Sequence, residues 1–226
     1  MKNLLMPILI GLMAVLYIFI IPHEPLGLKI VFKLIPMALI IIYAFQKLPG
    51  SSPLALRLVI IGLFFCMLGD GFIAVSFVAG LGAFLIGHLF YLTGFFKMAK
   101  SNLLRLAAII PIGLYSFLIG RQLIASLLSE GNQSLVIPVS AYMLVISAMA
   151  ISAILTGNKW VIAGSILFVI SDSILSWNMF VSDIIYSDVF IMTTYYSAQF
   201  LIASSLASLG RTAGKNIAKS DVIHKI

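Results

Sequence analysis

Eight apolar runs of about 20 residues dominate this sequence, and each is long enough to cross a membrane as a helix. Only 9% of the 226 residues are charged and 62% are hydrophobic, whereas a soluble domain carries about 25% charged residues. Breaks rich in Pro, Gly, Ser and Asn separate the runs. We therefore predict an all-α, polytopic integral membrane bundle, with a single membrane domain (1–226) and about eight transmembrane helices. The predicted helices cover residues 4–21, 28–45, 56–77, 79–97, 103–120, 134–155, 160–181 and 189–209.

The distribution of basic residues predicts the orientation of the bundle. The first run follows Lys2 and resembles a signal peptide, but it is long enough to span and no A-x-A-like cleavage site follows. With the N-terminus inside, eleven of the fourteen Lys and Arg residues fall on the inner side. We predict that both termini are cytoplasmic, that residues 210–226 form a basic cytoplasmic tail, and that a bacterial inner (plasma) membrane holds the protein.

The net charge of +7 does not indicate a nucleic-acid partner, because the charges lie at the ends of the apolar runs rather than in one patch. Membrane lipids are the expected surroundings. The sequence does not define the oligomeric state.

Two apolar runs each contain one carboxylate, at Asp70 and Asp172. An Asp near the middle of a spanning helix costs about 2.5–3.5 kcal/mol, and such residues are usually functional. Aligning Asp70 with Asp172 also places Gly62 on Gly164. This match is consistent with two parallel four-helix halves, 1–101 and 102–226, but apolar helices also resemble each other by chance.

Other polar side chains lie at a similar depth in the predicted helices. At 1.5 Å per residue, they fall about 8–15 Å from the outer ends of six helices. This convergence predicts a single polar site in the outer half of the membrane. Each member also has a structural alternative, namely packing, snorkelling or a hydrogen bond between helices. The members are Lys33, Asp70, His88, Tyr142, Asp172, Tyr195, Tyr196 and Gln199, with Tyr91 on the same face as His88.

Known site motifs are missing from the sequence. There is no paired metal-ligand spacing, no G-x-S-x-G elbow, no phosphate-binding glycine loop and no dinucleotide fingerprint. We therefore predict neither a metal site nor a cofactor. Gly80, Gly87 and Gly94 recur every seven residues, which predicts close helix packing. Acid–base chemistry by carboxylates and proton-coupled transport remain as functional classes.

At these residues the sequence resembles the YhhN family of integral membrane lysoplasmalogenases over nearly its whole length. The resemblance is carried by four segments in order: KLIP (33–36), GDGFI (69–73) with GLGAFLIGHLFY (80–91), GSILFVISDSIL (164–175), and YYSAQFLI (195–202). Tyr142 also matches. Trp177 departs from the family pattern, and we expect its bulk to reshape the acyl pocket.

The resemblance implies hydrolysis of the vinyl ether bond of a lysoplasmalogen, a lysophospholipid, to a fatty aldehyde and a glycerophospho-amine. Vinyl ethers hydrolyse by protonation of the carbon–carbon double bond, followed by capture of an oxocarbenium ion by water. This division of labour suits two carboxyl groups. We expect Asp70 and Asp172 to form the acid/base pair, in either order, and His88 to orient Asp70.

The remaining predicted site residues are assigned to the substrate. Lys33 is expected to meet the substrate phosphate. Tyr195, Tyr196 and Gln199 are expected to position water or the glycerol end, with Tyr91 and Tyr142 as further substrate-binding residues.

Two other functions stay open from the sequence. A small proton-coupled transporter could use the same Asp and His residues. A non-catalytic scaffold would use the Asp residues only to lock helices together.

Overall fold

The computed structural model describes the backbone of residues 4–22, 24–50, 52–100 and 102–223, and side chains as far as Arg211. All regular structure in this part of the chain is helical, as predicted. The helices are α1 (Leu5–Phe19), α2 (Leu26–Lys47), α3 (Leu54–Ile73), α4 (Phe77–Lys97), α5 (Leu103–Leu106), α6 (Ile109–Ser129), η1 (Gln133–Leu135), α7 (Val136–Thr156), α8 (Lys159–Phe180) and α9 (Ser187–Ile223).

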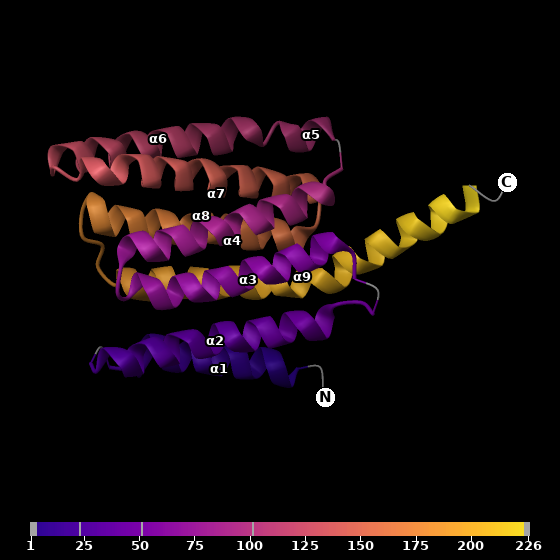
Figure 1. Cartoon of the computed structure of the whole chain (residues 1–226), viewed down its shortest axis with the longest axis horizontal. Helices are drawn as coiled ribbons and strands as arrows, with labels where there is room; N and C mark the ends of the chain where they lie inside the picture. Colours follow the sequence, from indigo (N-terminus) through magenta and orange to yellow (C-terminus); the bar gives the residue numbers. More distant parts are fainter. Residues whose placement is uncertain (1–3, 23, 51, 101, 224–226) are drawn as a thin grey trace.

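The long helices run alternately up and down the bundle, and the described chain starts and finishes at the same end (Figure 1). We call this the terminal end, and the end with the α1–α2, α3–α4, α6–α7 and α8–α9 connections the distal end. Among the described residues, seven helical segments are long and apolar enough to span a membrane, and α1 is a shorter apolar helix. The predicted fold class is therefore confirmed. The cytoplasmic location of the terminal end stays a prediction.

Glycine residues allow α3 and α4 to pack closely, as the seven-residue spacing predicted. A Cβ atom on Gly87 would lie 2.9 Å from the Cys66 sulfur and 3.1 Å from the Gly62 carbonyl oxygen. A Cβ on Gly94 would lie 2.9 Å from the carbonyl oxygen of Ala55. The backbones of α3 and α4 approach at a distance that only glycine permits.

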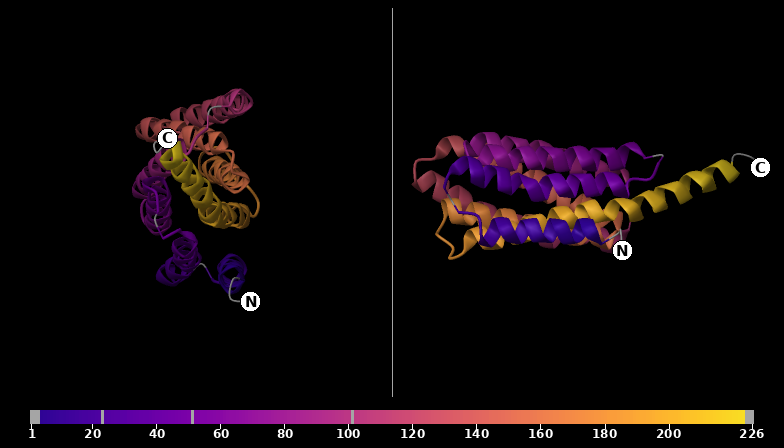
Figure 2. Two further views of the ribbon diagram at one scale, coloured as in Figure 1. Left: turned by 90° about the vertical axis from the view of Figure 1, so that its right-hand side faces the viewer. Right: turned by 90° about the horizontal axis from the view of Figure 1, so that it is seen from below.

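Helices α8 and α9 form a second close pair. A Cβ on Gly164 would lie 2.9 Å from the carbonyl oxygen of Ala198. Gly62 and Gly164, which the repeat alignment superimposes, thus both lie where two helices meet closely. The duplication itself stays a prediction. Seen end-on, α1 lies at one edge of the bundle and α6 at the opposite edge (Figure 2).

Some helix boundaries differ from those predicted. Helix α3 ends at Ile73 and α4 begins at Phe77, rather than at residues 77 and 79. The reason is Ser76, whose extended backbone and side-chain hydroxyl, 3.4 Å from the Ala79 amide, cap α4. The predicted helix 103–120 is replaced by the short α5 and by α6. Helix α6 continues to Ser129 because Leu123 and Leu127 pack in the bundle against α7 and α8.

The last helix is longer than predicted. The predicted range stopped before Gly210, a residue type that often follows helix ends. In the structure Gly210 lies inside α9, where a Cβ would come 2.8 Å from Cγ of Pro49. Helix α9 continues to Ile223 and projects beyond the bundle (Figure 1). The predicted tail 210–226 is thus helical as far as it is described, and residues 224–226 lie outside the described residues.

Candidate active site

Asp70 is a buried carboxylate with two polar partners. It lies near the distal end of α3 and is 2% exposed. The Lys33 ammonium of α2 lies 3.4 Å from its Oδ1 atom. The hydroxyl of Tyr195, on α9, donates a hydrogen bond of 2.6 Å to its Oδ2 atom. A buried charge is tolerated when it is paired and hydrogen-bonded, and Asp70 meets both conditions.

Asp172 has a different environment. It lies on α8 and is half-buried. Its Oδ2 atom accepts a hydrogen bond from the hydroxyl of Tyr142 on α7. In the described part of the chain, Asp172 forms no ion pair within 4.0 Å. The two carboxyl groups therefore differ in charge compensation, since only Asp70 faces a cation.

Asp70 and Asp172 line the same cavity. Its volume is about 360 Å³, and it lies between α1, α2, α3, α8 and α9 towards the distal end of the bundle. The predicted site residues Lys33 and Tyr195 also line it. We call it the polar cavity. Its polar lining consists of Tyr17, Lys29, Lys33, Asp70, Ser171, Asp172, Asp188 and Tyr195.

Other predicted site residues lie behind the cavity wall. The hydroxyl of Tyr91 donates a 2.6 Å hydrogen bond to Oε1 of Gln199, and both side chains are fully buried. Tyr196 donates a 2.8 Å hydrogen bond to the backbone carbonyl of Lys33. None of these three residues lines the polar cavity. Their predicted contacts with substrate or water stay predictions, while the structure gives them contacts that position α2, α4 and α9.

His88 forms no hydrogen bond to Asp70 among the described residues, and its role in orienting Asp70 stays a prediction. Its Nδ1 atom lies 2.7 Å from the carbonyl oxygen of Phe84 in the preceding turn of α4. Its ring packs edge-on against Phe168 and Tyr142, with centroid distances of 4.4 and 5.4 Å. Its Nε2 atom is buried and has no hydrogen-bond partner among the described residues. His88 therefore supports Tyr142, the partner of Asp172.

No cluster suited to a metal ion is found in the described part of the chain. Metal sites need several ligating side chains at one point. Within the described ranges, no three His, Cys, Asp or Glu side chains come together in this way.

A comparison with known protein families shows to which family the chain belongs. The model of the YhhN family matches residues 28–206, which is most of the chain. The chain belongs to the YhhN family. No solved structure matches it significantly.

Several proteins named lysoplasmalogenase resemble this YhhN chain. Mouse lysoplasmalogenase TMEM86B is 28% identical over 210 residues, which cover 90% of this chain and 86% of the mouse protein. Human lysoplasmalogenase TMEM86B is 35% identical over 133 residues, covering 58% of this chain and 54% of the human protein. A lysoplasmalogenase of Mycobacterium tuberculosis is 30% identical over 165 residues, covering 66% and 60%.

The sequence prediction missed two charged residues at the mouth of this YhhN cavity. Lys29 lies one helical turn before Lys33, and its ammonium is 3.9 Å from Asp188 Oδ2 in the first turn of α9. Asp188 is 72% exposed, which places this pair at the entrance. The four-residue spacing of Lys29 and Lys33 was the available signal, because residues four apart share a helix face.

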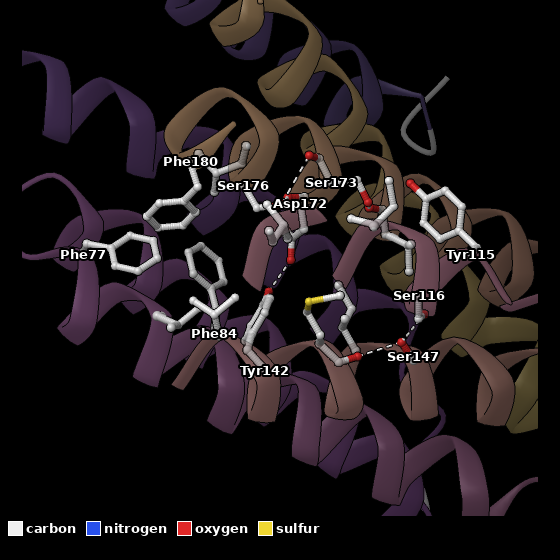
Figure 3. A pocket seen from close by; sticks show the side chains of 18 of the residues that line it. Phe77, Phe84, Tyr115, Ser116, Tyr142, Ser147, Asp172, Ser173, Ser176 and Phe180 are labelled. Atoms are coloured by element: carbon white, nitrogen blue, oxygen red, sulfur yellow. Dashed lines mark hydrogen bonds between the residues drawn. The ribbon is translucent and has the colours of Figure 1, made fainter. Parts of the chain in front are cut away.

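A second cavity of the YhhN fold lies on the other side of Asp172, between α4, α6, α7 and α8. We call it the apolar groove; Figure 3 shows Asp172 and Tyr142 in its wall. Trp177 does not line it, and its predicted effect on the acyl pocket stays a prediction. Instead, its indole nitrogen donates a 3.0 Å hydrogen bond to Ser182, near the end of α8. Four residues line both cavities: Ile73, Phe84, Asp172 and Leu175.

Proposed function

We propose that this chain is a membrane-embedded hydrolase that cleaves the vinyl ether bond of lysoplasmalogens to a fatty aldehyde and a glycerophospho-amine. One observation carries the proposal: two carboxyl groups, Asp70 and Asp172, face one cavity among membrane-spanning helices. The names of the mouse, human and mycobacterial relatives support the substrate. The seven long apolar helices make the chain a multi-pass membrane protein, and its placement in a bacterial inner membrane stays a prediction.

We assign the general acid to Asp172. Vinyl ether hydrolysis starts when a proton is added to the carbon–carbon double bond, so the acid must hold a proton at the start. A protonated carboxyl group is neutral and needs no cation beside it, whereas a buried carboxylate does. Asp172 has this environment, and Tyr142 occupies its Oδ2 atom. Its Oδ1 atom is thus the one available to deliver the proton.

Asp70 takes the complementary role. Protonation creates an oxocarbenium ion, and an ionised carboxylate stabilises this cation, as in glycosidases. Lys33 and Tyr195 compensate the charge of Asp70 in the resting site. Asp70 then accepts a proton from the water that attacks the oxocarbenium carbon. The carbon–oxygen bond of the resulting hemiacetal breaks, and its hydroxyl proton goes to the leaving glycerol oxygen, which gives the aldehyde and the glycerol hydroxyl. The proton that Asp70 took from water then passes to Asp172 and restores the resting site.

The charged pair at the entrance suits a zwitterionic headgroup. A lysoplasmalogen with an amine headgroup carries a phosphate and an ammonium group. The Lys29 ammonium is placed to bind the phosphate, and the carboxylate of Asp188 to bind the ammonium. Lys33 lies one turn deeper beside Asp70, so Lys29 is the lysine nearer the entrance and shares the phosphate contact predicted for Lys33.

The transporter alternative has less support, because the named relatives are hydrolases. The scaffold alternative makes a separate prediction, since Asp→Asn changes would then alter folding and not turnover.

The test is aldehyde release from a lysoplasmenyl-ethanolamine by purified protein in detergent. D70N and D172N should each lose at least about 100-fold in turnover while remaining folded, because general acid–base groups contribute about 10²–10⁴-fold. D183N is the matched control, since Asp183 is an exposed carboxylate in the α8–α9 connection. Near-wild-type turnover by a folded D70N or D172N would exclude the paired mechanism. A wild-type protein that releases no aldehyde would exclude the activity.

A further inference from the structure

We propose that the apolar groove binds the hydrocarbon chain of the lysolipid and sets which chain lengths are accepted. This inference rests on the proposed function, because it places one part of the same substrate. The open space in the groove is about 70 Å³, against about 360 Å³ in the polar cavity. Most of the side chains that line the groove are Ile, Leu, Val, Phe or Met, which suits a hydrocarbon chain and not a solvated headgroup.

The position of Asp172 between the two cavities carries the inference. The vinyl ether joins the polar glycerol part of a lysoplasmalogen to its hydrocarbon chain. A residue that protonates this group must therefore face a polar space on one side and an apolar space on the other. Asp172 lines both the polar cavity and the apolar groove, together with the apolar side chains Ile73, Phe84 and Leu175. The reacting bond then lies where the two cavities adjoin.

The two ends of the groove differ, and this difference predicts the direction in which the hydrocarbon chain of the lysolipid extends. At the distal end, the rings of Phe77 and Phe180 pack edge-to-face at 5.3 Å. The hydroxyl of Ser126 also donates a hydrogen bond to the carbonyl of Phe180, which ties α6 to α8 there. Towards the terminal end, the groove reaches Tyr115, whose side chain is 40% exposed. The hydrocarbon chain of the lysolipid therefore extends from Asp172 past Ile119 towards Tyr115.

The serine residues along this path do not oppose an alkyl chain. Ser147 donates a 2.6 Å hydrogen bond to the Met143 carbonyl, so Ser116 is the donor in the 2.7 Å contact between the two serine hydroxyls. Ser173 donates likewise to the carbonyl of Val169 at 2.7 Å. Because these hydroxyls already have partners, burying them under hydrocarbon leaves no donor unsatisfied (Figure 3).

Neighbouring residues on α6 provide a matched pair of variants. Ile119 lines the groove, whereas Leu118 is 55% exposed on the bilayer side. I119W should fill the groove and L118W should not. Activity is measured as kcat/KM on lysoplasmenyl-ethanolamines with 10-carbon and 18-carbon chains. I119W should lower the ratio of long-chain to short-chain activity at least about tenfold, since pocket contacts with even one methylene can discriminate by that much. L118W should keep the wild-type ratio.

A binding experiment separates this inference from the proposed reaction. The probe is a saturated, non-cleavable ether lysolipid with a photoreactive diazirine near the end of its chain. Cross-links in the wild-type protein should map to α6 and α7 around Tyr115 and Ser147, and I119W should reduce them. Cross-links confined to bilayer-facing positions, or an unchanged chain-length ratio in an active I119W, would overturn the inference. Missing aldehyde release with groove cross-links intact would refute the reaction alone.

Discussion

The ammonium of Lys33 lies 3.4 Å from Oδ1 of Asp70, so α2 and α3 meet through an ion pair that is almost fully removed from solvent. The backbone carbonyl of the same lysine accepts a hydrogen bond from Tyr196 on α9. Three helices are thus fixed around one carboxylate. This arrangement makes the pair important for stability as well as for the reaction.

Replacing Lys33 by Met should destabilise the protein markedly. The substitution leaves the Asp70 carboxylate buried without its cation, and breaking a buried ion pair costs about 3–5 kcal/mol. The double variant K33M/D70N should recover much of this loss, because it removes both charges. Thermal unfolding in detergent measures the effect. K29M is the control, since Lys29 is more exposed; equal destabilisation by K33M and K29M would contradict the prediction.

Replacing Tyr142 by Phe should slow turnover without unfolding the protein. The change removes only the hydroxyl that donates to Asp172. Asp172 becomes charged as it gives up its proton, and a hydrogen bond to a charged group contributes about 1.5–3 kcal/mol. That corresponds to about 10–150-fold in kcat/KM when the bond acts in the transition state. Y186F is the control, because Tyr186 is 73% exposed and lines neither the groove nor the polar cavity. Equal rates for Y142F and the wild type would remove Tyr142 from the mechanism.

Changes at the cavity entrance should affect substrate binding more than chemistry. K29Q removes the cation placed for the phosphate. We expect KM for lysoplasmenyl-ethanolamine to rise about 3–10-fold with kcat nearly unchanged, because a partly exposed charge contributes about 1 kcal/mol.

The same entrance predicts headgroup preference. D188N should reduce the preference for an amine headgroup over a neutral glycerol headgroup, measured as a ratio of kcat/KM values. If K29Q lowers kcat and leaves KM unchanged, Lys29 acts in the reaction and not at the entrance.

Two glycines of α4 give opposite stability predictions. G87A should destabilise the bundle by about 1–3 kcal/mol, because the new methyl would lie 2.9 Å from the Cys66 sulfur and force α3 and α4 apart. In G82A no atom lies within 4 Å of the new methyl. That change should be neutral or stabilising by up to about 1 kcal/mol, since Ala is the better helix former. Unfolding midpoints that rank G87A above G82A would disprove the packing explanation.

The sequence predicted the height of the polar residues along the bundle better than the direction they face. Apolar run lengths fix where helices cross, so Lys33, Asp70, Asp172 and Tyr195 were expected near one level, and all four line the polar cavity. Depth alone does not say on which side of a helix a residue lies. His88 was therefore assigned to Asp70, while its ring packs against Tyr142.

Other features depend on tertiary contacts that no local pattern encodes. The extension of α6 to Ser129 depends on the burial of Leu123 and Leu127 against other helices. Gly210 lies within α9 and not at its end, and the lack of a side chain there leaves room for Pro49. Lys29 and Asp188 were visible as charges at helix ends, and their pairing appears only when α2 and α9 are placed together.

The two carboxyl groups belong to different close-packed helix pairs, with Asp70 on the α3–α4 pair and Asp172 on the α8–α9 pair. The distance between the two carboxyl groups thus depends on how the two helix pairs pack together. The hydrogen bond from Tyr195 on α9 to Asp70 on α3 joins the pairs. Helix α1 packs chiefly against α2 and α9 and contributes to neither pair. The distance between the two carboxyl groups therefore does not depend on α1, although Tyr17 of this helix closes one side of the polar cavity. The helices that hold the proposed reacting groups and the helix that covers them are thus separate parts of the bundle.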